Sequence, residues 1–257
     1  DFRDLAKKKR RVEVGLTSEY SVGGIFVDEN MFTGVPGLYA AGEAASGVFG
    51  AKRVADAVTE MLVQGYKAGE VAAARASEQT RVASDDAAIE RAVGVLEKLL
   101  SNQGGIAVSE AIDRLGEISD NALGMVRNET TLRAGVEAFE TLGAEMDGIS
   151  LRGKSLRYNR ELMQALAARN LLACSRVAAK MALERRESRG LHLRDDYSYI
   201  DNENWQVRQL AELVNGEDKL SKKVPVVTRI PLRKAEKIDY ESFILEEDLG
   251  MKNMEES

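Results

Sequence analysis

No proline interrupts the chain between Pro36 and Pro225, and this long stretch is the feature that most limits the possible folds. Proline removes a backbone donor and clashes with the preceding turn, so its absence permits long helices. Between residues 85 and 100, apolar side chains recur at helical spacing on Ile89, Val93, Leu96 and Leu100. We therefore expect a helical bundle in this part of the chain.

Further helices are expected on the same grounds. Asn128 is a good N-cap residue, because its side chain can accept a hydrogen bond from a first-turn backbone N–H. The helix after it carries an apolar face of Leu132, Val136, Phe139 and Leu142, and an earlier helix carries Ile112, Leu115, Ile118 and Ala122. A long helix over about residues 155–188 would place together Leu162, Leu166, Asn170, Cys174, Val177 and Met181, with Cys174 in the core.

The first part of the chain has a different pattern. Short apolar runs broken by Gly and Pro favour short strands over residues 12–16, 24–28 and 37–41, because β-branched and aromatic residues alternate there with turn formers. Helical character begins near Lys52. We therefore predict an α/β segment over residues 1–83.

The last part of the chain is irregular in sequence. After His192 the only clear signal is an expected strand over residues 223–230, where Pro225 suits a sheet edge. The predicted organisation is thus the α/β segment, an all-α helical bundle over residues 84–190, and an irregular C-terminal extension over residues 191–257.

Composition excludes several classes of function. A net charge of −6 argues against general nucleic-acid binding, which needs a basic surface. No apolar run approaches the roughly 18 residues of a membrane-spanning helix. One cysteine cannot form a disulfide framework or hold an iron–sulfur cluster, and one histidine cannot build a histidine metal site. We therefore expect no metal in this chain and a cytoplasmic location.

The chemically suggestive region begins with a strand that ends in Gly42, where the backbone can approach a ligand closely. Glu43 follows at once, and a carboxylate at a strand end can accept hydrogen bonds from ligand hydroxyls. A second glycine turn, Gly47 to Gly50, leads into a helix whose first N–H groups carry a partial positive charge. Arg53 beside that helix start suits a carboxylate ligand. Taken alone, the pattern fits ordinary turn glycines with a surface Glu and Arg equally well.

The order of several motifs resembles one family, the flavoproteins of fumarate reductase, succinate dehydrogenase and L-aspartate oxidase. Three of its signatures are similar to Tyr20–Ile25, Val35–Glu43 and Gly50–Arg53. Later motifs follow in the family's order at Gly124–Asn128, Tyr158–Glu161 and Glu187–Tyr197. The resemblance implies that residues 1–83 are the C-terminal part of an FAD-binding domain.

The resemblance also implies roles for single residues. FAD would be the cofactor, and hydride would pass between the flavin and a small organic acid. Glu43 would bind the ribityl hydroxyls, Gly24 and Gly42 would lie close to the cofactor, and the N–H groups of Ala57 and Val58 would face the flavin pyrimidine edge. Arg53 would hold the carboxylate of the substrate.

Two departures from the family pattern bear on the substrate. Glu19 stands where the family has a substrate-binding histidine, and Lys52 stands where it has asparagine. A carboxylate at position 19 would repel a dicarboxylate. We therefore expect Arg53 and Glu19 to act together on an altered organic acid.

The Gly-x-Gly-x-x-Gly fingerprint of dinucleotide binding does not occur in these residues. We expect it in an N-terminal FAD-binding half, in the same or a separate chain, and we expect an iron–sulfur subunit as a further partner. Such a complex could lie at the inner face of the membrane. The alternative is a non-catalytic assembly subunit that docks on a flavoprotein partner.

Three other features favour structural roles. His192 is expected to make a structural hydrogen bond, and Trp205 to anchor a junction. An ion-pair network of Arg189, Arg194, Asp195 and Asp196 would join the bundle to the flavin domain.

Overall fold

The computed structural model describes residues 20–45, 57–78, 85–214 and 217–223. Residues 20–45 form turns rather than long strands. Only single residue pairs bridge here, Ile25 with Ala45 and Phe32 with Tyr39, before the short 3₁₀ helix η1 (Gly42–Ala44). The strands expected over 24–28 and 37–41 are therefore wrong, because left-handed residues such as Met31 (φ 61°) reverse the backbone before a ladder can form. The strand expected over 12–16 lies outside the described residues.

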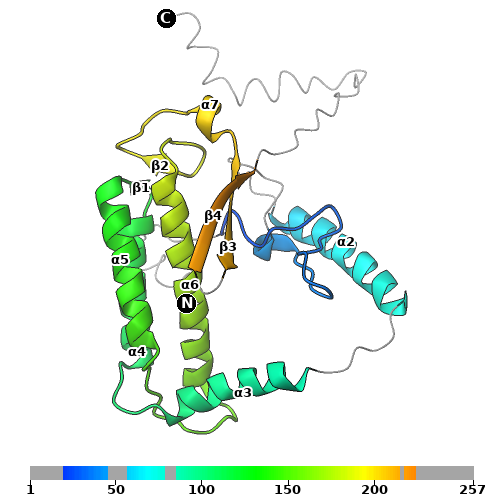
Figure 1. Ribbon diagram of the computed structural model, residues 1–257, viewed down its shortest axis with the longest axis vertical. Coiled ribbons are helices and arrows are strands. Elements are labelled where there is room, and N and C mark those ends of the chain that lie inside the picture. Colours follow the sequence, from blue (N-terminus) through cyan, green and yellow to red (C-terminus); the bar gives the residue numbers. More distant parts are fainter. Residues whose placement is uncertain (1–19, 46–56, 79–84, 215–216, 224–257) are drawn as a thin grey trace, which may run out of the picture. The chain divides into compact units, whose positions relative to one another are not determined.

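Five long helices follow in the described residues: α2 (Ala57–Glu78), α3 (Asp86–Ser101), α4 (Val108–Leu123), α5 (Glu129–Met146) and α6 (Arg160–Glu184). Helices α4, α5 and α6 pack against one another (Figure 1). A Cβ atom on Gly135 of α5 would lie 2.2 Å from the Cβ of Ala122 in α4, so this crossing needs glycine. The predicted helical bundle is confirmed.

Polar side chains set the starts of these helices. Asp85 accepts a hydrogen bond from the backbone N–H of Ala88 at 3.1 Å, and Asn159 accepts one from Leu162 at 3.0 Å. Asn128 and Thr131 form a reciprocal capping box. The N-cap predicted at Asn128 is therefore confirmed, and the long helix is shorter than expected because Asn159 begins it.

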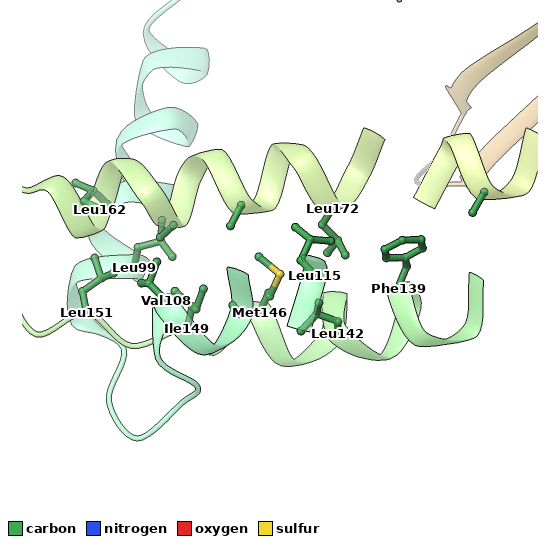
Figure 2. Packing of buried hydrophobic residues seen from close by; sticks show 14 of the residues in the cluster. Leu99, Val108, Leu115, Phe139, Leu142, Met146, Ile149, Leu151, Leu162 and Leu172 are labelled. Carbon is green, nitrogen blue, oxygen red and sulfur yellow. The ribbon is translucent and has the colours of Figure 1, made fainter. Parts of the chain in front are cut away.

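The bundle core is apolar and closely packed. Leu115 of α4, Phe139 of α5 and Leu172 of α6 belong to one cluster of buried residues (Figure 2). Leu99 near the end of α3 joins the same cluster and is fully buried. Toward the start of α3, by contrast, Ile89 is 52% exposed, so only the last turns of the expected α3 face contact the core.

The expected buried face of α6 is partly wrong. Leu162 is buried, but Asn170 and Cys174 are exposed. Residues at repeated intervals of four advance about 400° per step, so they drift off the core side by about 40° each time. The buried residues instead follow a mixture of intervals of three and four: Leu162, Ala165, Ala168, Leu172, Ser175, Ala179 and Ala182.

Residues after α6 contain more regular structure than expected. Strand β1 (Val126–Arg127) pairs in parallel with β2 (Leu193–Arg194), and α7 (Asn202–Trp205) is a single turn. Strands β3 (Arg208–Val214) and β4 (Glu217–Lys223) form an antiparallel pair. Apart from Lys223, the strand expected over 223–230 lies outside the described residues.

These elements confirm the expected order of a first part, an all-helical bundle and a C-terminal extension, although the described residues of the first part contain only single β-bridges, the short helix η1 and the long helix α2. The boundaries drawn at residues 83 and 190 stay predictions. None of the helices that the described residues form is both long and apolar enough to cross a bilayer.

Candidate functional site

Two short backbone segments form the base of the candidate site. The N–H of Ile25 donates to the carbonyl oxygen of Ala44 at 2.8 Å, which holds residues 20–25 against residues 40–45. Gly24 lies at this contact with φ +152°, and a Cβ atom on it would be 2.6 Å from the Ala44 oxygen. Glycine at position 24 therefore permits the close approach of the two segments.

Glu43 lies in η1, exposed and fixed by one hydrogen bond. Its Oε1 accepts from the backbone N–H of Ser21 at 2.7 Å. Within the part of the chain that the structure describes, no hydrogen bond to Oε2 is present. The carboxylate is thus held in one orientation and keeps an oxygen available to a ligand.

Gly42 does not present its N–H to a ligand. This N–H donates to Oε1 of Gln64, on α2, at 2.7 Å in a buried contact. Gly42 has φ +67°, and a Cβ atom on it would lie 3.1 Å from the Cγ of Met61. Position 42 favours glycine because the backbone there is left-handed and α2 approaches it closely.

Sequence reasoning missed two buried polar side chains on α2. Glu60 is 4% and Gln64 5% exposed, and Nε2 of Gln64 donates to Oε1 of Glu60 at 3.1 Å. The hydroxyl of Tyr20 donates to Oε2 of Glu60 at 2.7 Å. The signal that could have revealed them is their spacing of four residues within an otherwise apolar helical run.

The described part of α2 begins at Ala57, and its first turn is open. Val58 is 63% exposed, and the apolar side chains of Met61, Leu62, Val63 and Tyr66 are also exposed. Backbone N–H groups in a first helical turn lack partners within the helix. The role of the N–H groups of Ala57 and Val58 stays a prediction, because residues 46–56 before them lie outside the described residues.

Arg53 and Glu19, the two predicted catalytic residues, lie outside the described residues. By chain order, Glu19 precedes Tyr20, and Arg53 lies between Ala45 and the described start of α2. The structure thus brings together Gly24, Gly42 and Glu43 from the predicted set.

A second polar cluster surrounds His192. Nη1 of Arg127 lies 3.1 Å from Nδ1 of His192, whose Nε2 lies 3.3 Å from the carbonyl oxygen of Arg185. Burial, helped by the charge of Arg127, lowers the pKa of His192 from 6.5 to about 4. His192 is therefore neutral near pH 7 and makes the structural contacts that were predicted.

Buried ion pairs lie beside this histidine. Fully buried Glu187 binds Arg185 and Arg189, and Arg194, only 2% exposed, binds Asp196. Burial raises the pKa of Glu187, but the hydrogen bonds from Arg189, from the backbone of Asp201 and from Arg185 outweigh it and lower that pKa.

Among the described residues, this network joins parts of the helical region and makes no hydrogen bond or ion pair with residues 20–45. Its hydrogen-bond partners lie at the start of α5, at the end of α6 and in residues 185–209. Trp205 is buried there, with the guanidinium of Arg185 5.2 Å from its ring centre. The anchoring role predicted for Trp205 fits this position. Its contact with Arg185 lies within the helical region and not at a junction with the flavin domain.

An open cavity of about 760 Å³ lies between α5, α6 and β4. Its charged groups pair with each other: Asp218 binds Arg176 and Lys180, and Asp147 binds Arg169. None of the predicted site residues lines it. Among the described residues, no group of His, Cys, Asp and Glu side chains is arranged to hold a metal ion.

Comparison with known families gives two matches. Residues 112–240 match the family described as the fumarate reductase flavoprotein C-terminal region, and residues 2–56 match an FAD-binding domain. The second match confirms the prediction of FAD as the cofactor.

Individual relatives agree with these matches. The fumarate reductase flavoprotein subunit of Haemophilus influenzae is 34% identical over 196 residues, which are 75% of this chain and 33% of that subunit. This chain spans about a third of the length of the curated relatives it matches.

Solved structures show the same fold. A Mycobacterium smegmatis Sdh1 complex in the apo form has a TM-score of 0.78 and 30% identity, covering 90% of this chain and 40% of that one. The Escherichia coli quinol fumarate reductase has a TM-score of 0.76 and 27% identity, covering 85% and 38%. The chain therefore belongs to the flavoprotein family of fumarate reductases and succinate dehydrogenases.

Proposed function

We propose that these residues form one wall of the FAD site in an oxidoreductase of the succinate/fumarate type. The observation that carries the proposal is the fixed carboxylate of Glu43, whose Oε1 is held by the Ser21 N–H at 2.7 Å. A carboxylate held in one orientation by the backbone loses little freedom when it binds a ligand hydroxyl. The residues present fit a flavin nucleotide in this respect.

Each residue of the wall has a distinct part in holding the cofactor. Oε2 of Glu43 accepts a hydrogen bond from a ribityl hydroxyl, and the N–H groups of Ala57 and Val58 stabilise electron density at the pyrimidine edge. Gly24 allows the two segments of the wall, residues 20–25 and 40–45, to approach each other closely. FAD, when bound, supplies or accepts the hydride of the reaction.

Arg53 and Glu19 are proposed to act on the substrate. Arg53 binds a carboxylate of an organic acid through paired N–H donors. Glu19 carries a negative charge where a second substrate carboxylate would otherwise be bound, and like charges in a desolvated site repel. The preferred substrate is therefore an organic acid without a second carboxylate at that position.

The chain requires partners for this activity. An N-terminal half carrying the dinucleotide fingerprint completes the FAD site, and an iron–sulfur subunit passes electrons onward. Such a complex would act in electron transport at the cytoplasmic face of the membrane. The exposed apolar side chains of Val58, Leu62, Val63 and Tyr66 on α2 support a covering segment of this kind.

The test uses the full-length flavoprotein that contains this chain. We expect the purified protein to carry FAD, seen as flavin absorbance, and to oxidise or reduce small organic acids. Arg53→Ala should lower kcat/KM by at least about 100-fold, since a paired carboxylate contact contributes about 3 kcal/mol. Arg75→Ala serves as the control, because Arg75 lies exposed in the last turn of α2.

Two outcomes would decide against the proposal. Protein that contains no FAD after purification and binds none when FAD is added would overturn the flavin site. Bound FAD without reductase activity would favour the alternative of a non-catalytic assembly subunit. Activity that Arg53→Ala leaves intact would overturn the substrate-binding role proposed for Arg53.

A further inference from the structure

Four residues around the candidate site are linked by a continuous chain of hydrogen bonds. The N–H of Gly42 donates to Gln64 at 2.7 Å, Gln64 donates to Glu60 at 3.1 Å, and the Tyr20 hydroxyl donates to Glu60 at 2.7 Å. None of these contacts involves a group predicted to touch the cofactor except the Gly42 backbone.

The chain of bonds closes into a ring. Gly42 is joined covalently to Glu43, whose carboxylate binds the N–H of Ser21 at 2.7 Å. Ser21 is in turn the neighbour of Tyr20. The ring therefore ties three segments together: residues 20–21, the turn at 42–43, and the first two turns of α2.

The direction of each bond in the ring is determined by chemistry. A backbone N–H can only donate, so the amide oxygen of Gln64 must face Gly42 and its amide nitrogen must face Glu60. Each oxygen of the Glu60 carboxylate then accepts one of these bonds. Replacement of Gln64 removes the acceptor of the Gly42 N–H, and replacement of Glu60 removes an acceptor of Gln64 and Tyr20.

In this part of α2 the usual burial of an amphipathic helix is reversed, with polar side chains buried and apolar side chains exposed. Glu60 and Gln64 are buried, whereas Leu62 and Val63 are exposed at 68% and 64%. A fully satisfied polar network in a buried position specifies one geometry more strictly than an apolar contact does. The arrangement therefore holds the Gly42–Glu43 turn in one defined position.

We propose that Gln64 and Glu60 are positioning residues for the flavin wall, an inference that rests on the proposed function. They do not touch FAD. They hold the Gly42–Glu43 turn and the Ser21 N–H at a fixed separation, which keeps Oε2 of Glu43 directed to its ligand. The same contacts fix Tyr20, the residue that follows Glu19 in the chain.

The test compares the same substitution at two positions of one helix in the full-length flavoprotein. Glu60→Gln leaves one acceptor oxygen for the two donors on Gln64 and Tyr20, whereas Glu70→Gln changes a side chain that is 56% exposed. We expect Glu60→Gln and Gln64→Leu to weaken FAD binding to the apoprotein by about tenfold, measured by quenching of flavin fluorescence. Glu70→Gln should leave the affinity unchanged.

A double-mutant cycle separates positioning from general destabilisation. If Gln64 acts through Glu43, Gln64→Leu should weaken FAD binding about tenfold in the wild-type background but less than about twofold in a Glu43→Gln background. Equal effects in both backgrounds would overturn the inference. Melting temperatures of all four proteins, with and without FAD, show whether folding alone explains the loss.

The remaining outcomes are also decisive. If Gln64→Leu does not fold, Tyr20→Phe removes a single hydroxyl from the same ring, and unchanged FAD affinity in that variant would overturn the inference. Wild-type protein that binds no FAD would overturn the proposed function itself. If the wild-type protein binds FAD, and Glu60→Gln and Gln64→Leu bind it with the same affinity as the wild type, the inference alone is overturned.

Discussion

Nη1 of Arg127 lies 3.1 Å from Nδ1 of His192, and this contact determines the protonation of the imidazole. A guanidinium can only donate, so Nδ1 must be the acceptor and the proton of the neutral ring lies on Nε2. Nε2 faces the carbonyl oxygen of Arg185 at 3.3 Å. His192 thereby connects β1, just after α4, to the C-terminal end of α6.

The first prediction concerns pH. Burial first, and then the charge of Arg127, lowers the pKa of His192 from 6.5 to about 4. As pH falls below about 6.5, the unfolded chain takes up a proton here while the folded chain does not, so the free energy of unfolding falls. The loss should be up to about 3 kcal/mol and complete near pH 4.

His192→Gln provides the comparison for this prediction, since glutamine does not titrate. His192 is the sole histidine of the chain, so denaturation curves between pH 7 and pH 4 should differ in slope between the two proteins. Parallel pH profiles would show that His192 is protonated equally in the folded and unfolded states.

The second prediction concerns the start of α5. Asn128→Ala removes the side chain that accepts the Thr131 N–H at 2.9 Å, and should destabilise the protein by about 1 kcal/mol. Thr130→Ala is the control, because Thr130 is exposed in the same turn. Urea denaturation measures both. A cost for Asn128→Ala no larger than that for Thr130→Ala would contradict the capping role.

The third prediction tests the bundle core with one substitution at two places. Leu142→Ala empties a fully buried position between helices and should cost about 2–5 kcal/mol. Leu171→Ala removes a side chain that is 56% exposed and should change stability by less than about 1 kcal/mol. The opposite ranking in denaturant would mean that the two helices pack differently.

The fourth prediction uses two neighbouring glycines. Gly23 and Gly24 both have positive φ, but only a Cβ on Gly24 would meet backbone atoms, the Ala44 oxygen at 2.6 Å. Both alanine variants should therefore show backbone strain, and Gly24→Ala should lose about 1–3 kcal/mol more than Gly23→Ala. Thermal unfolding of the two variants, together with their FAD content, checks the difference. Equal melting temperatures would argue that the two segments can separate without cost.

Much of the helical region was predictable because its signals are local. Asn128 begins α5 through contacts within one turn, and the apolar face of Leu132, Phe139 and Leu142 follows from helical period alone. Prediction failed for α6, where one helix face had to be followed from Leu162 to Met181, over about five turns. A small error in the assumed period accumulates over that length, which is why Cys174 was expected in the core and is exposed.

In the candidate site, too, some features could be predicted from the sequence and others could not. The motif around Glu43 and the glycines at 24 and 42 could be read from the sequence, because their chemistry depends on residue type and order. The positions of Arg53 and Glu19 stay predictions. The role of Glu60 and Gln64 was not readable, since it depends on which side of α2 meets the Gly42 turn.

The sequence by itself determined the family, most of the helices and the cap at Asn128, because each depends on local spacing or residue chemistry, and the flavin-binding residues it indicates stay predictions. Only the tertiary structure decided that the Gly42 N–H is directed to Gln64 and that Glu43 is fixed by Ser21. Those contacts join residues 22 positions apart in the chain, and no local pattern encodes which distant donor meets which acceptor.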